Sequence, residues 1–144
     1  MRILIHGINF SPELTATGKY TGEMAAWLAG RGHELRAVTA PPYYPDWRIG
    51  SGYSGRRYRR ERRSIGEGSL SVWRCPLWVP EVQSGAKRLL HLASFALSSA
   101  PVMLAQAAWR PGSNRPPCVA AIEPGLALIV RNRTVKGVGV YERN

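Results

Sequence analysis

Residues 1–40, MRILIHGINF SPELTATGKY TGEMAAWLAG RGHELRAVTA, decide the fold. Residues 3–5 form a short apolar run that ends just before a glycine, which predicts a buried strand. Residues 18–29 repeat large apolar side chains at helical spacing, and residues 34–39 predict a second strand. A strand, a glycine-bearing loop, a helix and a strand within forty residues predict a βαβ unit with parallel strands.

The rest of the chain predicts fewer elements, separated by long loops. We expect a loop over residues 40–55, a strand over 71–75, a helix over 86–108 and a strand over 118–122. Pro101 is expected to kink this second helix or to split it in two. The predicted fold class is α/β, with a Rossmann-like open parallel sheet and flanking helices.

Composition is typical of one globular domain, but charge is not. The 144 residues are 44% hydrophobic and carry a formal net charge of +11, which favours anionic partners. Cys75 and Cys118 have no CxxC or Cys/His spacing, which argues against a disulfide framework and a structural zinc site. The N-terminus lacks the pattern of a signal peptide, so we expect a cytoplasmic protein. The apolar stretch 89–109 is interrupted by polar residues, which favours a buried or surface-lying helix over a membrane span.

Six arginines fall within residues 56–63, and they are the strongest local concentration of charge. A solvated loop is the simplest interpretation of this run. Contact with phosphate, anionic lipid or nucleic acid is the functional alternative. Tyr58 is the single aromatic residue within the run, too few for a stacking platform for bases. The side chains assigned to membrane or anion contact are Arg56, Arg57, Arg59 and Arg60.

The glycine at the start of the first helix invites a comparison with phosphate-binding loops. The P-loop pattern fails, because Glu13 stands where its first glycine belongs and Tyr20 stands where Ser or Thr should follow Lys19. Gly18 at a helix N-terminus still suits a phosphate, although a helix cap without a ligand explains it too. Glu123 follows the last predicted strand, at the edge where α/β sheets bind ligands.

Several motifs together resemble the beginning of family 4 glycosyltransferases, in particular those of colanic acid biosynthesis. The resemblance covers about residues 1–111. It is carried by the segments Met1–Ile5, Ser11–Glu13, Gly18–Met24, Ala29–Leu35, Thr39–Pro45, Trp73–Pro80 and Arg88–Phe95.

The resemblance implies a GT-B enzyme, of which this chain would be the N-terminal, acceptor-side half. Such an enzyme is retaining, needs no metal or other cofactor, and transfers a sugar from a nucleotide-sugar donor to an exopolysaccharide intermediate, here a lipid-linked glycan. The catalytic residues stay unknown. The implied substrate-binding residues are Asn9, Gly18, Lys19, Tyr20, Tyr43, Tyr44 and Glu123.

Beyond Pro111 the motifs stop, so two regions are expected. Residues 1–111 would form the Rossmann-like domain, and residues 112–144 a divergent tail, either disordered or the product of a frameshift. We expect such a fragment to be inactive alone. The alternative function is a non-catalytic basic module that binds anionic membrane or nucleic acid. Of these two partners, we expect anionic membrane and not nucleic acid. The chain would then lie peripherally on the inner face of the plasma membrane.

Overall fold

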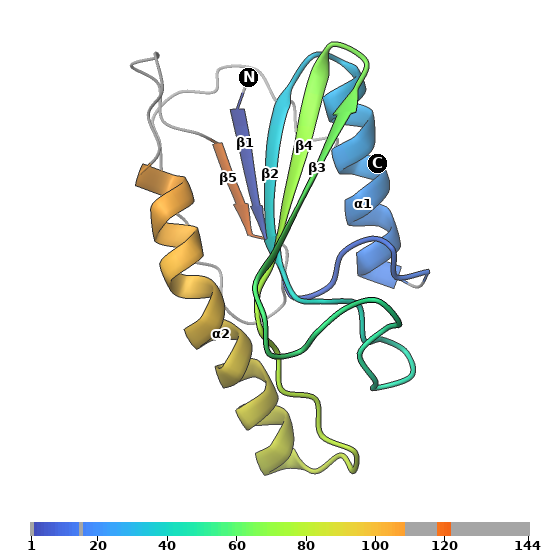
Figure 1. Cartoon of the computed structure of the whole chain (residues 1–144), viewed down its shortest axis with the longest axis vertical. Coiled ribbons are helices and arrows are strands. Elements are labelled where there is room, and N and C mark those ends of the chain that lie inside the picture. Colours follow the sequence, from blue (N-terminus) through green and yellow to red (C-terminus); the bar gives the residue numbers. More distant parts are fainter. Residues whose placement is uncertain (1, 15, 109–117, 122–144) are drawn as a thin grey trace, which may run out of the picture.

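The computed structural model describes residues 2–14, 16–108 and 118–121. One sheet lies between two helices that differ in length (Figure 1). In chain order the elements are β1 (Arg2–His6), α1 (Ala16–Gly30), β2 (Glu34–Thr39), β3 (Arg59–Ile65), β4 (Gly68–Arg74), α2 (Gly85–Ala108) and β5 (Cys118–Ala121).

The sheet has the strand order β3-β4-β2-β1-β5. Strands β4, β2, β1 and β5 run parallel to one another, and β3 pairs antiparallel with β4 at the edge. The predicted βαβ unit is confirmed, because β1 and β2 pair in parallel with α1 between them in the chain. The Rossmann-like α/β class is confirmed as well, with one antiparallel strand added at an edge.

That added strand corrects our simplest interpretation of the arginine run. Arg59 and Arg60 lie in β3, while Arg56 and Arg57 precede it. The run folds because β4 supplies its backbone hydrogen bonds through a hairpin whose turn contains Gly66 at φ +57°. Charge does not prevent pairing at a sheet edge, and charged side chains there discourage association with a further strand.

The face of the sheet under α1 is closely packed and apolar. Helix α1 lies over β4, β2 and β3. Its Ala25 and Ala29 are fully buried and pack with Leu35, Leu70 and Val72 in one core cluster. Small side chains on the helix let it approach the strands. The large apolar side chains whose spacing predicted the helix are not its buried face, since Tyr20 and Trp27 are 67% and 57% exposed.

The opposite face is covered in part by α2, which lies over β1 and β2. Phe95 packs there with Leu4 and Val38 in a second core cluster, which also includes residues of the loops after β2 and β4. The helix continues through Pro101 as one element, so the expected split does not occur. Most of its surface stays exposed, since only 17% of the most apolar stretch of the helix is buried.

Candidate functional site

The loops that follow β1, β2 and β4 meet at one edge of the sheet. These three strands are parallel, so their carboxyl ends, at His6, Thr39 and Arg74, lie side by side. In open α/β sheets this edge binds ligands. In Figure 1 the N-terminal half of α2 extends past the same edge, next to these loops.

Glu13 joins the first of these loops to the second. Its Oε1 accepts hydrogen bonds from the backbone N–H groups of Tyr43, at 3.1 Å, and Tyr44, at 3.2 Å. The residue is 5% exposed, and burial raises its pKa although the two N–H groups and Arg74 oppose that shift. Its Oε2 has no hydrogen-bond partner among the described residues. Glu13 thus fixes the position of the tyrosine loop.

Arg74 ties the same loops to the β3 edge. Its guanidinium donates to the carbonyl oxygens of Ala40, at 3.1 Å, and Ser11. Its Nε lies 3.5 Å from Oε1 of Glu61 on β3, close enough for an ion pair. Burial lowers the pKa of Arg74, and Glu61 counteracts this. The sequence motifs contain Glu13 and Arg74, but we assigned neither of them a role. For Arg74, its position as a charged residue at the end of an apolar strand could have indicated one.

The predicted residues around the first helix lie at this edge and differ in burial. Gly18 is buried, and a Cβ there would come within 2.6 Å of Oε2 of Glu13, so packing alone requires a glycine. Tyr20 is 67% exposed, and exposed Lys19 lies 3.9 Å from Glu23. Asn9 is half-buried, and its Oδ1 has no hydrogen-bond partner among the described residues. A role in substrate binding stays a prediction for all four.

The two predicted tyrosines face different surroundings. Tyr43 is 7% exposed and belongs to the core cluster under α2, so its ring mainly packs against other side chains of the core. Tyr44 is 42% exposed and free to meet a ligand. Glu123 lies outside the described residues. Among the described residues no group of three or more His, Cys, Asp or Glu side chains could hold a metal ion.

An open groove of about 1190 Å³ lies between the loop after β2, the segment after β4 and α2. Aromatic side chains line it, and its charges balance: Asp46 and Glu81 oppose Arg48 and Arg56. The sequence pointed to this loop but placed the ligand at its tyrosines. The aromatic lining of the groove consists of Trp47, Tyr53 and Trp78.

His91 of α2 lies behind this groove and contacts two of its walls. Its Nδ1 donates to the carbonyl oxygen of Trp78 at 2.7 Å, and its ring centroid is 5.3 Å from that of Trp47. The Tyr43 ring meets His91 edge-on at 4.9 Å. Burial lowers the pKa of His91 and so favours its neutral form; its Nε2 has no hydrogen-bond partner among the described residues.

The predicted anion contacts lie beside α2. Arg56, Arg57, Arg59 and Arg60 are all exposed. Tyr58, in the middle of this run, donates its hydroxyl to the carbonyl oxygen of Ser98 in α2 at 2.9 Å. The structure thereby joins the basic segment to the exposed helix, which no sequence pattern indicated.

Comparison with known proteins identifies one close likeness. Over 111 residues the chain is 60% identical to the protein assigned as the colanic acid biosynthesis glycosyl transferase WcaI of Escherichia coli (strain K12). The chain is a relative of WcaI. The match takes in 77% of this chain and 26% of WcaI, so the chain spans about a quarter of that protein's length. No protein-family model and no solved structure matches the chain.

The similarity to WcaI confirms the resemblance to colanic acid glycosyltransferases that the motifs indicated. The finer assignment to glycosyltransferase family 4 stays a prediction. So does the division into two regions, although a match of 111 residues has the length that we expected for the conserved part.

Proposed function

We propose that the chain is the acceptor-side part of a retaining glycosyltransferase, which moves a sugar from a nucleotide-sugar donor to a lipid-linked exopolysaccharide intermediate. The observation that carries the proposal is the 60% identity to WcaI over 111 residues. The loops at the carboxyl edge of β1, β2 and β4 support it, because a substrate cleft in an α/β sheet opens there. The proposal includes neither a metal nor another cofactor.

A chimera tests this proposal. The matched 111-residue segment of WcaI is replaced by the segment of this chain, in an E. coli strain that lacks WcaI. We expect colanic acid production to return, because two sequences that are 60% identical have compatible cores. A soluble, full-length chimera that restores no polysaccharide contradicts the proposal. The 144-residue chain alone should transfer no sugar, since catalysis needs transition-state contacts from both sides of a cleft.

We further propose that α2 and the adjacent arginines lie on an anionic membrane. Leu89, Leu97 and Leu104 are 70%, 78% and 70% exposed, and the helix is long and apolar enough to cross a bilayer by length and composition. A crossing is not proposed, because Phe95 and Ser99 of the same helix are buried against the sheet. A helix that keeps one face on its own domain can place the other in the headgroup region.

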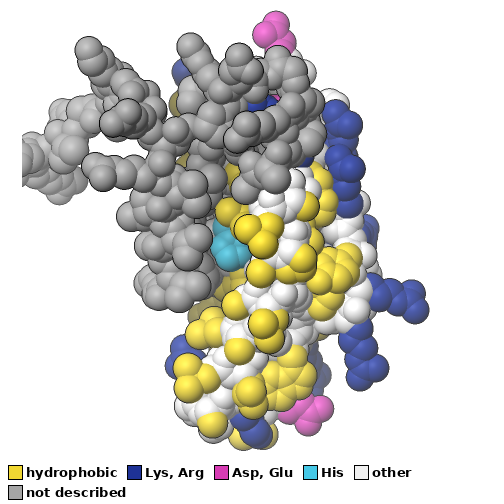
Figure 2. Space-filling model, turned by 90° about the vertical axis from the view of Figure 1, so that its left-hand side faces the viewer, with side chains coloured by type: hydrophobic (Ala, Val, Ile, Leu, Met, Phe, Trp, Pro, Cys, Tyr) yellow, Lys and Arg dark blue, Asp and Glu magenta, His cyan; other side chains and the backbone are white. Residues whose placement is uncertain are grey.

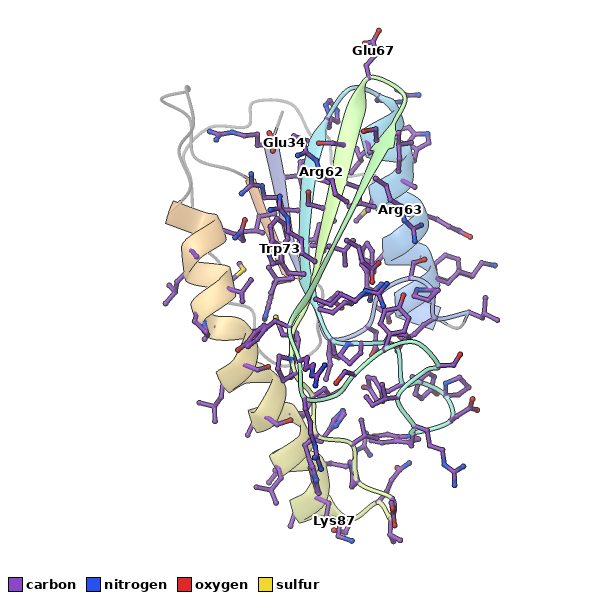
Figure 3. All side chains as sticks on the ribbon, viewed as in Figure 1. Glu34, Arg62, Arg63, Glu67, Trp73 and Lys87 are labelled. Carbon is purple, nitrogen blue, oxygen red and sulfur yellow. The ribbon has the colours of Figure 1, made fainter. Side chains whose placement is uncertain are left out.

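The distribution of charge supports a lipid partner over nucleic acid. Figure 2 shows hydrophobic side chains over most of the α2 surface, with Lys and Arg side chains along one edge of it. Lys87 lies at the N-terminal end of α2 (Figure 3), and Tyr58 holds the arginine segment against Ser98. An apolar surface bordered by cations suits acyl chains bordered by anionic headgroups. Nucleic acid offers no partner for the leucines.

Sedimentation with vesicles tests the membrane proposal. The chain should bind phosphatidylglycerol vesicles, bind phosphatidylcholine vesicles weakly, and dissociate as salt rises. R56Q/R57Q should weaken binding by about tenfold or more, since each arginine near the surface contributes roughly 1 kcal/mol. R62Q/R63Q is the matched control, because it removes the same charge from the upper part of the hairpin (Figure 3). Equal loss in both variants, or equal binding to both lipids, contradicts docking through this surface.

A further inference from the structure

We propose that the groove between Trp47 and Trp78 binds pyranose rings of the glycan acceptor. This inference rests on the proposed transfer to a glycan and names the subsite for its sugar. The groove lies after β2 and β4, at the carboxyl edge of the sheet, and Ser94 of α2 closes one side of it. Neither tryptophan was among the residues that the sequence motifs assigned to a substrate.

The electrostatic balance of the groove selects the class of ligand. The whole chain carries a net charge of +11, but the groove is lined by two acidic side chains, Asp46 and Glu81, and two basic ones, Arg48 and Arg56. A polyanion would gain little there, because the two carboxylates repel it. A polyhydroxylated neutral ligand meets both kinds of partner, since its hydroxyl groups donate to carboxylates and accept from guanidinium groups. The aromatic walls add flat apolar surfaces on which the C–H faces of a sugar ring can pack.

Trp78 is both available and held in place. Its indole is 45% exposed at the groove. Its backbone is fixed twice by α2: the N–H donates to Oγ of Ser94 at 3.1 Å, and the carbonyl accepts from Nδ1 of His91 at 2.7 Å. A large exposed aromatic side chain on an anchored backbone loses little freedom when a ligand packs on it.

Trp47 is held in a backbone conformation that bulky residues avoid. Its φ is +51°, in the left-handed region. Such a conformation persists where the surroundings enforce it, and it is concentrated at ligand-binding and active sites. Tyr43 packs edge-on against the indole at 5.6 Å, and His91 lies 5.3 Å away. Because His91 also bonds to Trp78, one histidine positions both aromatic walls.

The exposed face of α2 agrees with an acceptor that is part sugar and part lipid. Ser94, Trp78 and Glu81 bring the groove up to the N-terminal half of the helix. In that half, Leu89 and Leu90 are 70% and 59% exposed. A glycan held in the groove would therefore have an apolar surface beside it, where its lipid carrier or the bilayer could lie.

The test follows the indole N–H signals of the ¹⁵N-labelled 144-residue chain by NMR. The probe is a neutral oligosaccharide built of glucose and galactose units, because the carboxylates of Asp46 and Glu81 in the groove disfavour an acidic one. We expect saturable shifts of the Trp47 and Trp78 signals, with those of Trp27 and Trp73 unchanged. Trp78→Ala should weaken binding by about tenfold, and Trp78→Phe should restore part of it. Trp27→Ala is the matched control, because Trp27 is 57% exposed on α1, away from the groove.

Three results would overturn the subsite: no shift at the highest oligosaccharide concentration, equal shifts of all tryptophan signals, or tighter binding of a heparin fragment at the same two tryptophans. The WcaI chimera separates this inference from the proposed function. If the chimera restores colanic acid but the oligosaccharides shift neither signal, the subsite is wrong and the transferase proposal stands. If the shifts occur and the soluble chimera is inactive, the transferase proposal fails while the binding site stands.

Discussion

The two faces of the sheet differ in how closely side chains pack on them and in how polar those side chains are. Under α1, the contacts are between alanines, branched side chains and backbone, and Ala25, Ala29 and Leu35 are fully buried. Under α2, the buried side chains include His91 and Ser99, and several leucines on the outer surface of the helix meet solvent. Helix α1 completes a buried core. Helix α2 covers part of the opposite face of the sheet and leaves its own outer surface exposed to solvent.

This difference separates the scaffold from the surfaces available to ligands. Close packing over β4 and β2 resists change, because every atom there has neighbours on all sides. The α2 face carries the groove, the buried imidazole of His91 and the exposed apolar helix, all of which have capacity for further contacts. We therefore expect substitutions on the α1 face to affect stability strongly, and those on the outer α2 surface to affect binding with little change in stability.

The largest effect is expected at Gly68, where α1 and the turn before β2 come closest to β4. A Cβ at this position would press against the carbonyl oxygens of Ala29 and His33, which are backbone atoms and cannot rotate away. Gly68→Ala should lower the free energy of unfolding by about 3 kcal/mol or more. Urea denaturation of the whole chain measures it.

Gly85→Ala is the matched control for this substitution. Gly85 begins α2, has nothing within 4 Å of an added Cβ, and does not need a positive φ. Its replacement should leave stability unchanged within about 0.5 kcal/mol. Equal losses for the two alanines would show that the α1 face is not packed as closely as these contacts indicate.

The next largest effect concerns the ion pair that joins the β3 edge to the loops. Glu61→Gln leaves the guanidinium of Arg74, which is 2% exposed, without its carboxylate. We expect a loss of about 2 kcal/mol, below the usual cost of breaking a buried pair, because the 3.5 Å contact is not a hydrogen bond. Glu67→Gln, at the exposed tip of the hairpin, removes the same charge and should be neutral (Figure 3). If Glu61→Gln leaves the free energy of unfolding unchanged, the ion pair has no structural role.

The sequence predicted those parts of the molecule that follow from local periodicity. The first strand, the first helix and the second strand were recognised from short apolar patterns, and their parallel pairing followed from chain order. Strand β3 was missed because an arginine-rich segment has no apolar alternation, and its structure comes from pairing with β4. The sequence left open whether Pro101 kinks α2 or splits it; packing on β1 and β2 supports the helix from outside the local sequence, and the split does not occur.

The candidate site could be predicted to the level of loops, and not of side chains. Residues 40–55 were recognised as a long loop, with Tyr43 and Tyr44 as candidate substrate contacts, but which aromatic side chain is buried depends on contacts across the fold. Tyr43 packs against His91 of α2, and Trp47 turns toward the groove with a φ of +51°. Glu13 and Arg74 bind backbone groups on other loops, which no spacing in the sequence reveals.

A smaller effect is the pH dependence that half-buried His6 and buried His91 give to the α2 face. Burial lowers the pKa values of His6 and His91, so the folded chain favours their neutral forms. Their contribution to stability is complete above the unfolded value of 6.5 and is lost as the pH falls from there through the lower folded pKa values. Denaturation midpoints should therefore decrease from pH 7 to pH 5, and His91→Asn should reduce that decrease. Glu13 acts in the opposite sense at lower pH, because its raised pKa favours the protonated form in the fold.

The smallest effect on stability is expected on the outer surface of α2. Leu97 is 78% exposed, so Leu97→Ser removes almost no buried area and should change the free energy of unfolding by less than about 0.5 kcal/mol. Leu35→Ala, at a fully buried position, provides the contrast on the α1 face and should cost about 2–5 kcal/mol. The same Leu97→Ser chain should bind phosphatidylglycerol vesicles less well, because the leucine is available to the bilayer and not used by the fold. A large loss of stability together with unchanged vesicle binding would mean that this surface of α2 is covered in solution and belongs to the core.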